Sequence, residues 1–170
     1  MYIRKATVED SKQIAKVHIN SWKTTYKGII SDSYLASLSY EKKEKFWRNV
    51  SNLDNVLVAV LNGEIVGFIT YGPTRFPHLP YDGEVYAFYL LQKAQRQGIG
   101  TKMFKEAAKE LKKQDLNSFL VWVMEKNPSK SFYETFNPKI VQYEDIKIDG
   151  ETYCEVAFGY DSVEKVLSPK

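Results

Sequence analysis

The amino-acid sequence predicts a single domain of mixed α/β (α+β) class, with helices packed on a sheet. Three patterns support this prediction. Apolar residues recur at helical spacing over residues 14–26, Asn62-Gly63 separates two strand-like runs, and an amphipathic helix follows residues 98–100. No repeat or linker interrupts the chain. We therefore expect one domain over residues 1–162, followed by a frayed tail at residues 163–170.

Size and composition fit a globular protein. The chain has 170 residues, of which 44% are hydrophobic and 14% aromatic, which is enough for one core. The net charge is only +3, and basic residues are interspersed with acidic and apolar ones. A nucleic-acid partner is therefore not expected.

The cysteine content and the start of the sequence bear on the compartment. Cys154 is the single cysteine and cannot form a disulfide within the chain. The opening segment MYIRKAT has no apolar stretch long enough for a signal peptide or a membrane span. Together these features predict a cytoplasmic protein without a membrane partner.

The N-terminal half reads as a strand, a long helix, two short helices and a β-hairpin. Thr7 can cap the long helix, whose first turn carries Glu9 and Asp10 near the positive end of the helix dipole. Asn62-Gly63 suits a two-residue hairpin turn because both residues tolerate positive φ. The expected elements are a strand at 2–6, a helix whose apolar face includes residues 14, 18, 22 and 26, helices at 31–38 and 41–50, and strands at 56–61 and 64–71.

The C-terminal half begins with a loop at 72–83 that contains three prolines. The helix after Gly100 has a small apolar face, while lysines occupy its other face. Asp149-Gly150 again suits a hairpin turn. The expected elements are strands at 84–90 and 117–124, the helix from residue 100, a short helix at 129–136, and hairpin strands at 140–148 and 153–160.

Residues 95–101 connect a strand to the amphipathic helix and form the candidate ligand site. Gly98 and Gly100 let the backbone approach a ligand closely, and free N–H groups at a helix start favour an anion such as a pyrophosphate. Met103 stands where a dinucleotide fingerprint needs a third glycine, and Thr101-Lys102 does not match a P-loop. The alternative reading is that the two glycines only allow the helix to pack tightly on the sheet.

The segment FYLLQKAQRQGIGTKMFKEA resembles the coenzyme A segment of the GNAT (GCN5-related N-acetyltransferase) family, in which Gln or Arg, two residues, Gly, one residue, and Gly or Ala open the helix. The opening IRKAT-ED, the NGEIVGF hairpin, the GEVYAFYL strand and EKNPSKSFYETF also occur in family order, so the resemblance covers nearly the whole chain. It implies the GNAT fold, a mixed, mostly antiparallel central sheet flanked by helices, with two central strands splayed to hold the coenzyme.

The resemblance also implies an acetyl-CoA-dependent N-acetyltransferase that passes an acetyl group to a primary amine by direct attack in a ternary complex. The acceptor would be a small-molecule amine or a peptide amine, and a homodimer is compatible with this activity. The pantetheine arm would lie along one strand, and the rest of the coenzyme would contact the following loop. The implied coenzyme-binding residues are Phe88, Tyr89, Leu90, Gln95, Arg96, Gln97, Gly98, Ile99, Gly100, Thr101 and Asn127.

In NPSKSFYETF the resemblance places Tyr133 near the thioester sulfur, as the general acid. A phenol with a reference pKa of about 10 stays protonated near neutrality and can protonate a departing thiolate, whose thiol has a pKa of about 8.5. Phe132 and Tyr133 also fit a helix that packs its aromatic residues inward. Asn137-Pro138 departs from the usual Gly-containing pair of the family, although Asn tolerates the left-handed geometry of a helix end.

The attacking amine must lose a proton, and Glu84 is the candidate general base. The alternative reading of Glu84 is an exposed carboxylate at a strand start. His18 is a second candidate base, although a lone His on an apolar face is more often a packed, hydrogen-bonded residue. Some peptide-acetylating members of the family instead carry a Glu in the next strand, where this chain has Val121 and Val123, which disfavours a peptide acceptor.

Residues 22–38 and 72–83 are expected to shape the acceptor pocket, but they do not identify the acceptor. Their aromatic side chains could hold a cationic amine by cation-π contact or could be ordinary packing. No metal site is expected, because His78 has no second ligand at metal-binding spacing. Two other classes stay open, namely a non-catalytic acyl-CoA-binding regulatory module and a structural domain whose glycines serve packing only.

Overall fold

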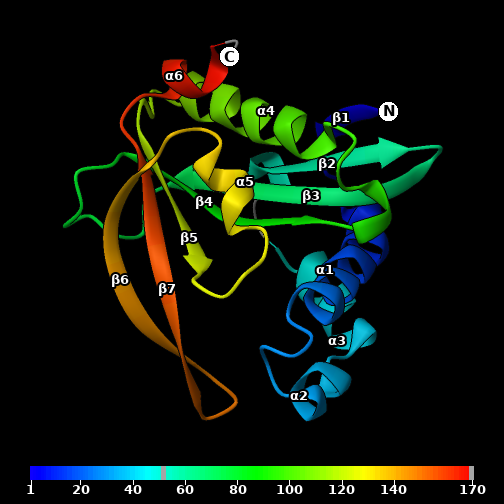
Figure 1. Cartoon of the computed structure of the whole chain (residues 1–170). Helices are drawn as coiled ribbons and strands as arrows, with labels where there is room; N and C mark the ends of the chain where they lie inside the picture. Colours follow the sequence, from blue (N-terminus) through cyan, green and yellow to red (C-terminus); the bar gives the residue numbers. More distant parts are fainter. Residues whose placement is uncertain (51–52, 169–170) are drawn as a thin grey trace. The chain divides into compact units, whose positions relative to one another are not determined.

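The computed structural model describes residues 1–50 and 53–168, which divide into two compact units. The first unit contains residues 1–70 and 87–107, and the second contains residues 71–86 and the chain from Ala108 onward. The seven strands are hydrogen-bonded in the order β1-β2-β3-β4-β5-β7-β6 (Figure 1). The β4–β5 pair is parallel, whereas β1–β2, β2–β3, β5–β7 and β6–β7 are antiparallel. The predicted mixed, mostly antiparallel sheet flanked by helices is confirmed.

The first unit follows the predicted element order closely. It contains β1 (Tyr2–Lys5), α1 (Ser11–Thr25), α2 (Asp32–Ser37), α3 (Tyr40–Arg48), β2 (Val56–Leu61), most of β3 (Glu64–Pro73), the end of β4 (Gly83–Leu90) and the start of α4 (Ile99–Lys113). The turn between β2 and β3 has φ values of 51° at Asn62 and 80° at Gly63, which confirms the predicted hairpin.

Helix α1 begins later than Thr7 because a short 3-10 turn, Val8–Asp10, precedes it. The Asp10 carboxylate accepts a hydrogen bond from the Thr7 amide over 2.8 Å and binds the Arg4 guanidinium. Asp10 therefore joins the end of β1 to the start of the helix. Arg4 holds the pKa of the Asp10 carboxyl below its usual value, so this link is charged at neutral pH.

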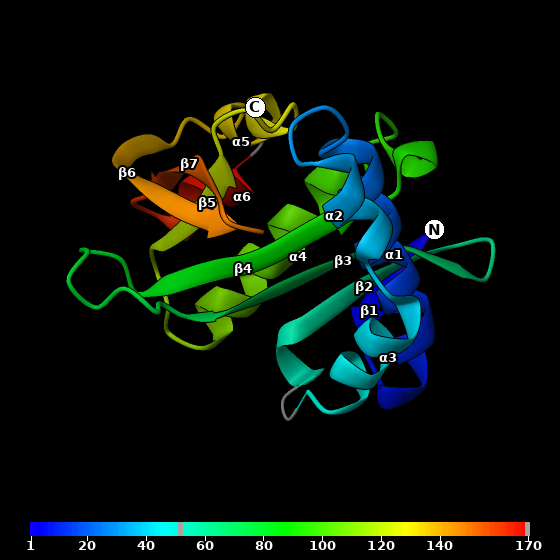
Figure 2. The same cartoon turned by 90° about the horizontal axis from the view of Figure 1, so that it is seen from below.

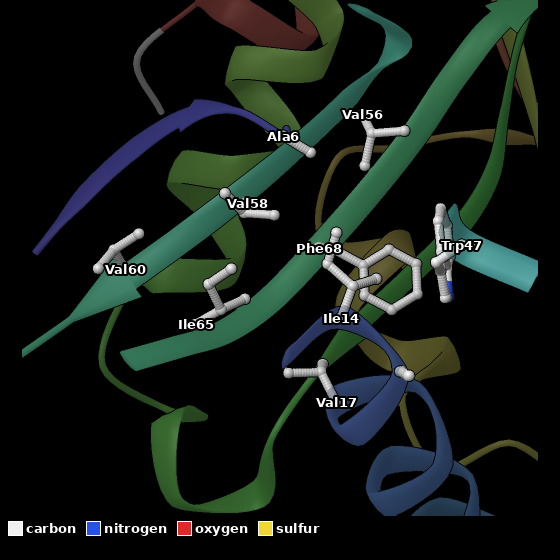
Figure 3. Close-up of a cluster of buried hydrophobic side chains, with 10 residues drawn as sticks. Ala6, Ile14, Val17, Trp47, Val56, Val58, Val60, Ile65 and Phe68 are labelled. Carbon is white, nitrogen blue, oxygen red and sulfur yellow. The ribbon is translucent and has the colours of Figure 1, made fainter. Parts of the chain in front are cut away.

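A cluster of buried side chains forms the core of the first unit (Figure 3). Ile14 and Val17 of α1 and Trp47 of α3 meet the strand residues Val58 and Phe68. The two helices also contact each other (Figure 2). The four-residue spacing of apolar side chains in α1 therefore marks the face that packs on β2 and β3.

The second unit contains the start of β4, the end of α4, β5 (Phe119–Met124), α5 (Lys130–Glu134), β6 (Lys139–Ile148), β7 (Glu151–Tyr160) and α6 (Val163–Leu167). The β6–β7 turn has φ values of 52° at Asp149 and 81° at Gly150, as predicted for a hairpin. Asn137 has a φ of 53°, which confirms that it supplies the left-handed residue after the short helix.

The expected frayed tail is wrong for residues 163–167. These residues form α6, and Val163 and Val166 are buried. The amide of Val163 also donates to the Asn117 carbonyl over 2.8 Å. Burial of two valines thus orders this segment, in which apolar residues stand beside Glu164 and Lys165. Residues 169–170 of the expected tail lie outside the described residues, and the expectation of one domain over residues 1–162 stays a prediction.

The pairing of β4 with β5 is short. In the described residues the parallel ladder consists of Gly83↔Phe119, Glu84↔Leu120 and Val85↔Val121. Strand β4 continues to Leu90 and β5 to Met124, where β5 keeps its antiparallel pairing with β7. The short ladder agrees with the splayed central strands that the sequence predicts.

Candidate functional site

The loop between β4 and α4 contains two residues with left-handed backbone. Arg96 has a φ of 60° and Gly98 a φ of 74°, and α4 begins at the next residue, Ile99. A Cβ atom placed on Gly98 would meet nothing within 4 Å, so the space beside this residue is open. The first N–H groups of a helix have no intrahelical acceptor, and the positive end of the helix dipole lies behind them. This loop can therefore bind an anion through backbone donors.

Two glutamine side chains hold this loop in place. Gln95 Nε2 donates to the Leu90 carbonyl over 3.0 Å, and Gln97 Nε2 donates to the Lys93 carbonyl over 2.9 Å. The Gln95 side chain thereby ties the loop to the end of β4. The sequence motif specifies residue types and not hydrogen-bond acceptors, so this supporting role was not predicted. Coenzyme contact by these two residues stays a prediction.

Successive residues at the end of β4 point to opposite faces of the strand. The Phe88 ring lies 6.4 Å from the Phe104 ring of α4, at an interplanar angle of 16°. The Tyr89 ring stacks on His18 of α1 with centroids 4.8 Å apart. Residues 88–90 therefore present their backbone between two layers of side chains.

Gly67 of β3 is a positioning residue that sequence reasoning missed. A Cβ on Gly67 would stand 2.8 Å from Leu90 Cδ1, 3.0 Å from the Tyr89 carbonyl oxygen and 3.1 Å from Met103 Sδ. Any larger residue would push against the backbone of the β4 segment that is expected to hold the coenzyme arm. A glycine inside a strand pattern was the available signal, since such glycines often mark a close approach of another backbone.

His18 lies in an aromatic cluster of the first unit. Its ring centroid is 5.5 Å from Phe68 and 6.2 Å from Trp47, in addition to the Tyr89 stack. Burial, with a smaller effect of the Lys43 charge, lowers the pKa of His18 to about 3. The imidazole is therefore neutral near pH 7 and is a weak base, so the geometry disfavours His18 as the general base.

The cluster extends into the segment that is expected to shape the acceptor pocket. Trp22 Nε1 donates to the Tyr89 hydroxyl over 2.9 Å. The Trp22 ring also contacts Tyr26 at 4.9 Å and Tyr34 at 6.3 Å between centroids. A line of aromatic side chains thus runs from the β4 segment along α1 to α2.

Glu84 is fully buried, with an exposed fraction of 0%, so the reading of an exposed carboxylate is wrong. Arg75, in the loop before β4, compensates the buried charge. Its Nη2 lies 2.5 Å from Glu84 Oε1, its Nε lies 3.2 Å from both carboxylate oxygens, and its backbone N–H donates to Oε2 over 3.0 Å. The hydrogen bonds with Glu84 hold the pKa of the Arg75 guanidinium above its usual value.

Asn127 and Tyr133 lie at the short helix α5 of the second unit. The Asn127 side-chain oxygen accepts a hydrogen bond from the Ser129 amide over 2.8 Å, so this side chain organises the turn before the helix. Tyr133 has an exposed fraction of 7%, and its carbonyl accepts from the Tyr160 hydroxyl of β7 over 2.9 Å. Tyr160 thereby fixes the backbone of the proposed general acid.

The predicted site residues are distributed over the two units. Residues 88–90 and 95–101 come together in the first unit, at the end of β4 and the start of α4. Glu84, Asn127 and Tyr133 belong to the second unit, with Glu84 at the paired end of β4.

Residues 1–50 and 53–168 contain no group of three or more His, Cys, Asp or Glu side chains arranged to hold a metal ion. No helix in the same residues is long and apolar enough to cross a membrane.

Comparison with known proteins places this geometry among acetyltransferases. The model of the acetyltransferase (GNAT) family matches residues 19–137. The chain is 43% identical over 159 residues to the uncharacterized N-acetyltransferase YuaI of Bacillus subtilis. The aligned segment covers 93% of this chain and 91% of that protein. The chain is 32% identical over 139 residues to a spermidine N(1)-acetyltransferase of Thermoplasma acidophilum, which covers 77% of this chain and 83% of that protein.

Solved structures share the fold at lower sequence identity. The PaiA N-acetyltransferase of Thermoplasma acidophilum, solved in complex with coenzyme A, superposes with a TM-score of 0.71 at 24% identity, covering 91% of this chain and 96% of that one. A ribosomal-protein-alanine N-acetyltransferase of Brucella melitensis superposes with a TM-score of 0.72 at 20% identity, covering 94% and 99%.

Proposed function

This chain belongs to the acetyltransferase (GNAT) family and is an acetyl-CoA-dependent N-acetyltransferase, and we propose that residues 88–90 and 95–101 bind the coenzyme while Tyr133 acts as general acid. When bound, acetyl-CoA supplies an activated acetyl group as a thioester. An amine attacks the thioester carbon directly, so the protein has to bind the coenzyme, orient the amine and manage two protons.

The observation that carries the proposed coenzyme site is the backbone between Arg96 and α4. Two left-handed residues, open space beside Gly98 and the first turn of a helix supply the donors and the room that a pyrophosphate needs. Exposed Arg96 adds a positive charge. The residues present therefore fit the coenzyme.

The adjoining segment of β4 is proposed to pair with the amides of the pantetheine arm. The ladder with β5 ends at Val85↔Val121, whereas β4 continues to Leu90. Gly67 lets residues 89–90 lie close to β3. The ring stacks of Phe88 and Tyr89 hold this backbone from both faces.

Tyr133 is proposed to hold a proton at Oη for the departing thiolate. The reference pKa of a phenol is about 10, which suits a proton donor near neutrality, and the bond from Tyr160 to the Tyr133 backbone fixes the helix that carries the phenol. Asn127 organises the preceding turn and is proposed to contact the coenzyme as well. The assignment of Glu84 as the base stays a prediction, and its ion pair with Arg75 favours a different role.

The acceptor is proposed to be a small-molecule amine. The relatives differ in the amine that their names give, spermidine in one and a ribosomal-protein alanine in another. In this chain the buried Val121 and Val123 occupy the strand where some peptide-acetylating members carry a Glu, which supports a small acceptor. The aromatic residues Trp22, Tyr26 and Tyr34 would line its path.

A thiol-release assay tests this function. Purified protein is incubated with acetyl-CoA and a panel of polyamines, amino acids, aminoglycosides and short peptides, and free thiol is measured over time. We expect thiol release that depends on one class of amine, with an acetylated product of matching mass. A protein that binds coenzyme A but acetylates nothing in the panel would support the regulatory alternative, which the N-acetyltransferase relatives do not favour.

Binding of coenzyme A can be measured separately from turnover. A ligand that binds only the folded state raises the melting temperature as the ligand concentration rises. At a concentration of 100 times the Kd, the free energy of unfolding increases by about 2.7 kcal/mol. An unchanged melting temperature at about millimolar coenzyme A would argue against the site. Size measurement in solution would test the expected homodimer in the same samples.

A further inference from the structure

Glu84 is at the centre of a network that holds the loop of residues 74–82 in the second unit. Both of its carboxylate oxygens accept hydrogen bonds from Arg75, whose backbone N–H and guanidinium both donate. The side chain of Glu84 is 1% exposed, whereas that of Arg75 is 61% exposed. The buried partner thus fixes an exposed arginine and the loop that carries it.

Other contacts hold the rest of the loop. The Thr74 amide donates to the Asp82 carbonyl over 2.9 Å, and the Tyr81 hydroxyl donates to Asp161 over 3.2 Å. The Arg75 guanidinium also lies 4.9 Å from the centre of the Tyr86 ring. These contacts lie at the two ends of the loop. Within it, the Leu79 amide donates to the Phe76 carbonyl over 3.0 Å, and the ring that follows Arg75, Phe76, packs with Leu79 against the buried cluster of Tyr81, Leu120 and Ala157.

The ring of Phe76, the residue after Arg75, packs near an indole whose N–H donor has no acceptor among the described residues. Phe76 lies 5.1 Å from the Trp122 ring of β5. Trp122 Nε1 is buried and has no hydrogen-bond acceptor among the described residues. A buried unpaired donor is costly, and an oxygen of a bound ligand or an ordered water would satisfy it. The loop therefore borders a place where a polar ligand group would be stabilised.

A general base must offer a free lone pair to the reacting amine. The Glu84 carboxylate is enclosed, and Arg75 neutralises its charge and occupies both oxygens. Taking up a proton at Glu84 would remove the charge that pairs with Arg75 and would break hydrogen bonds of this network, which is unfavourable. The geometry thus argues against proton transfer by Glu84 and favours a mechanical role.

We propose that Glu84 is a positioning residue, which acts through Arg75 to fix the loop of residues 74–82 beside Trp122 of the same unit, where a polar group of the acceptor amine would bind. This proposal rests on the proposed acetyltransferase function for its kinetic consequence, but the restraint of the loop is independent of it. In this proposal the loop controls how well the amine is bound and oriented, while the proposed coenzyme site lies at residues 88–90 and 95–101. Removing the Glu84 charge should therefore change the binding of one substrate and not of the other.

The test is Glu84→Gln, which keeps the size of the side chain and removes its charge. The control is Glu44→Gln, the same change at a partly exposed carboxylate that pairs with Arg48. Two readouts are measured on folded protein. The first is the rate of trypsin cleavage after Arg75 divided by the rate of cleavage after Lys109 in α4. Cleavage after Lys109 reports unfolding of the whole chain. The second is the set of kinetic constants for acetyl-CoA and for the best amine of the panel, as a function of pH.

We expect Glu84→Gln to speed cleavage after Arg75 relative to Lys109 by about tenfold, because the loop opens more often. The acceptor KM should rise by about the same factor, while the acetyl-CoA KM and the shape of the pH profile stay as in the wild type. Glu44→Gln should change neither readout.

Two results would overturn the proposal. One is wild-type cleavage after Arg75 in folded Glu84→Gln. The other is a fall in kcat of about 100-fold or more with an unchanged acceptor KM and loss of the acidic limb of the pH profile, which would identify a general base. If the wild type acetylates no amine, the proposed function fails, and the cleavage ratio still decides whether Glu84 restrains the loop.

Discussion

The indole N–H of Trp22 donates a hydrogen bond to the phenol oxygen of Tyr89 across 2.9 Å. This bond joins α1 to the segment of β4 that is proposed to hold the coenzyme arm. The two residues are 67 positions apart in the sequence, so this is a tertiary contact that the sequence does not indicate.

Tyr89→Phe should destabilise the protein, because it removes the acceptor and leaves the Trp22 N–H without this partner. We expect a loss of about 1 to 3 kcal/mol in the free energy of unfolding, measured by urea denaturation. Tyr2→Phe is the matched control, since Tyr2 is 58% exposed, and it should change stability by less than about 0.5 kcal/mol. Equal effects of the two substitutions would show that the Trp22 bond contributes nothing.

Gly98→Asp should weaken coenzyme A binding through charge and not through bulk. Open space surrounds the added Cβ, and the backbone there has a φ of 74°, which both Asp and Asn tolerate better than other residues. Gly98→Asn is therefore the neutral control of nearly equal shape. We expect Asp to raise the Kd for coenzyme A at least about tenfold above that of Asn in calorimetric titrations. Identical Kd values for the two variants would place the pyrophosphate elsewhere.

Tyr133→Phe should separate turnover from binding. It removes the hydroxyl and keeps the ring, so coenzyme A affinity should survive. If Tyr133 is the general acid, turnover should fall about 10²- to 10⁴-fold, equivalent to about 3 to 5 kcal/mol of transition-state stabilisation. Single-turnover kinetics should show the loss in the chemical step. A variant with near-wild-type chemistry and a stability loss of about 1 kcal/mol would instead indicate a structural hydroxyl.

His18 should make the protein less stable as the pH falls. Its pKa in the folded state is about 3, below the usual value of about 6.5, so the unfolded chain binds the extra proton between these values. Its contribution is complete above about pH 6.5 and declines by up to about 1.4 kcal/mol per pH unit on acidification. Lys43 of α3 adds to this effect, while the Tyr89 ring faces the imidazole from β4.

Stability curves of His18→Gln and His78→Gln test this prediction. His18→Gln should show a shallower loss of stability between about pH 6.5 and pH 4 than the wild type, whereas substitution of the exposed His78 should leave the slope unchanged. In NMR spectra the His18 ring protons, assigned by comparison with His78→Gln, should not shift between about pH 5 and pH 8. A shift of the His18 signals with a midpoint near pH 6 would contradict a buried neutral imidazole.

Most of the secondary structure could be predicted because its signals are local. Asn62-Gly63 and Asp149-Gly150 adopt the positive φ angles that their residue types favour, and α1 and α4 follow the apolar period. The exception is α6, which is too short for a clear periodic signal and is ordered by tertiary burial of Val163 and Val166.

The candidate coenzyme loop could be located from two glycines and a family resemblance, but its supports could not. The motif indicates where the backbone must bend, and Gly98 does bend there. That Gln95 holds the Leu90 carbonyl, and that Gly67 admits the β4 backbone, depends on which strand lies beside which.

The sequence by itself determined the order of elements, the hairpin turns, the family and the position of the candidate anion-binding loop, because each of these follows from neighbouring residues and their periodicity. Only the tertiary structure decided the surroundings of Glu84 and His18. Burial in a medium of low polarity and a charged partner change the properties of an ionisable side chain. Arg75 pairs with the buried Glu84, burial keeps the His18 imidazole neutral, and neither environment is visible in the residues that flank them.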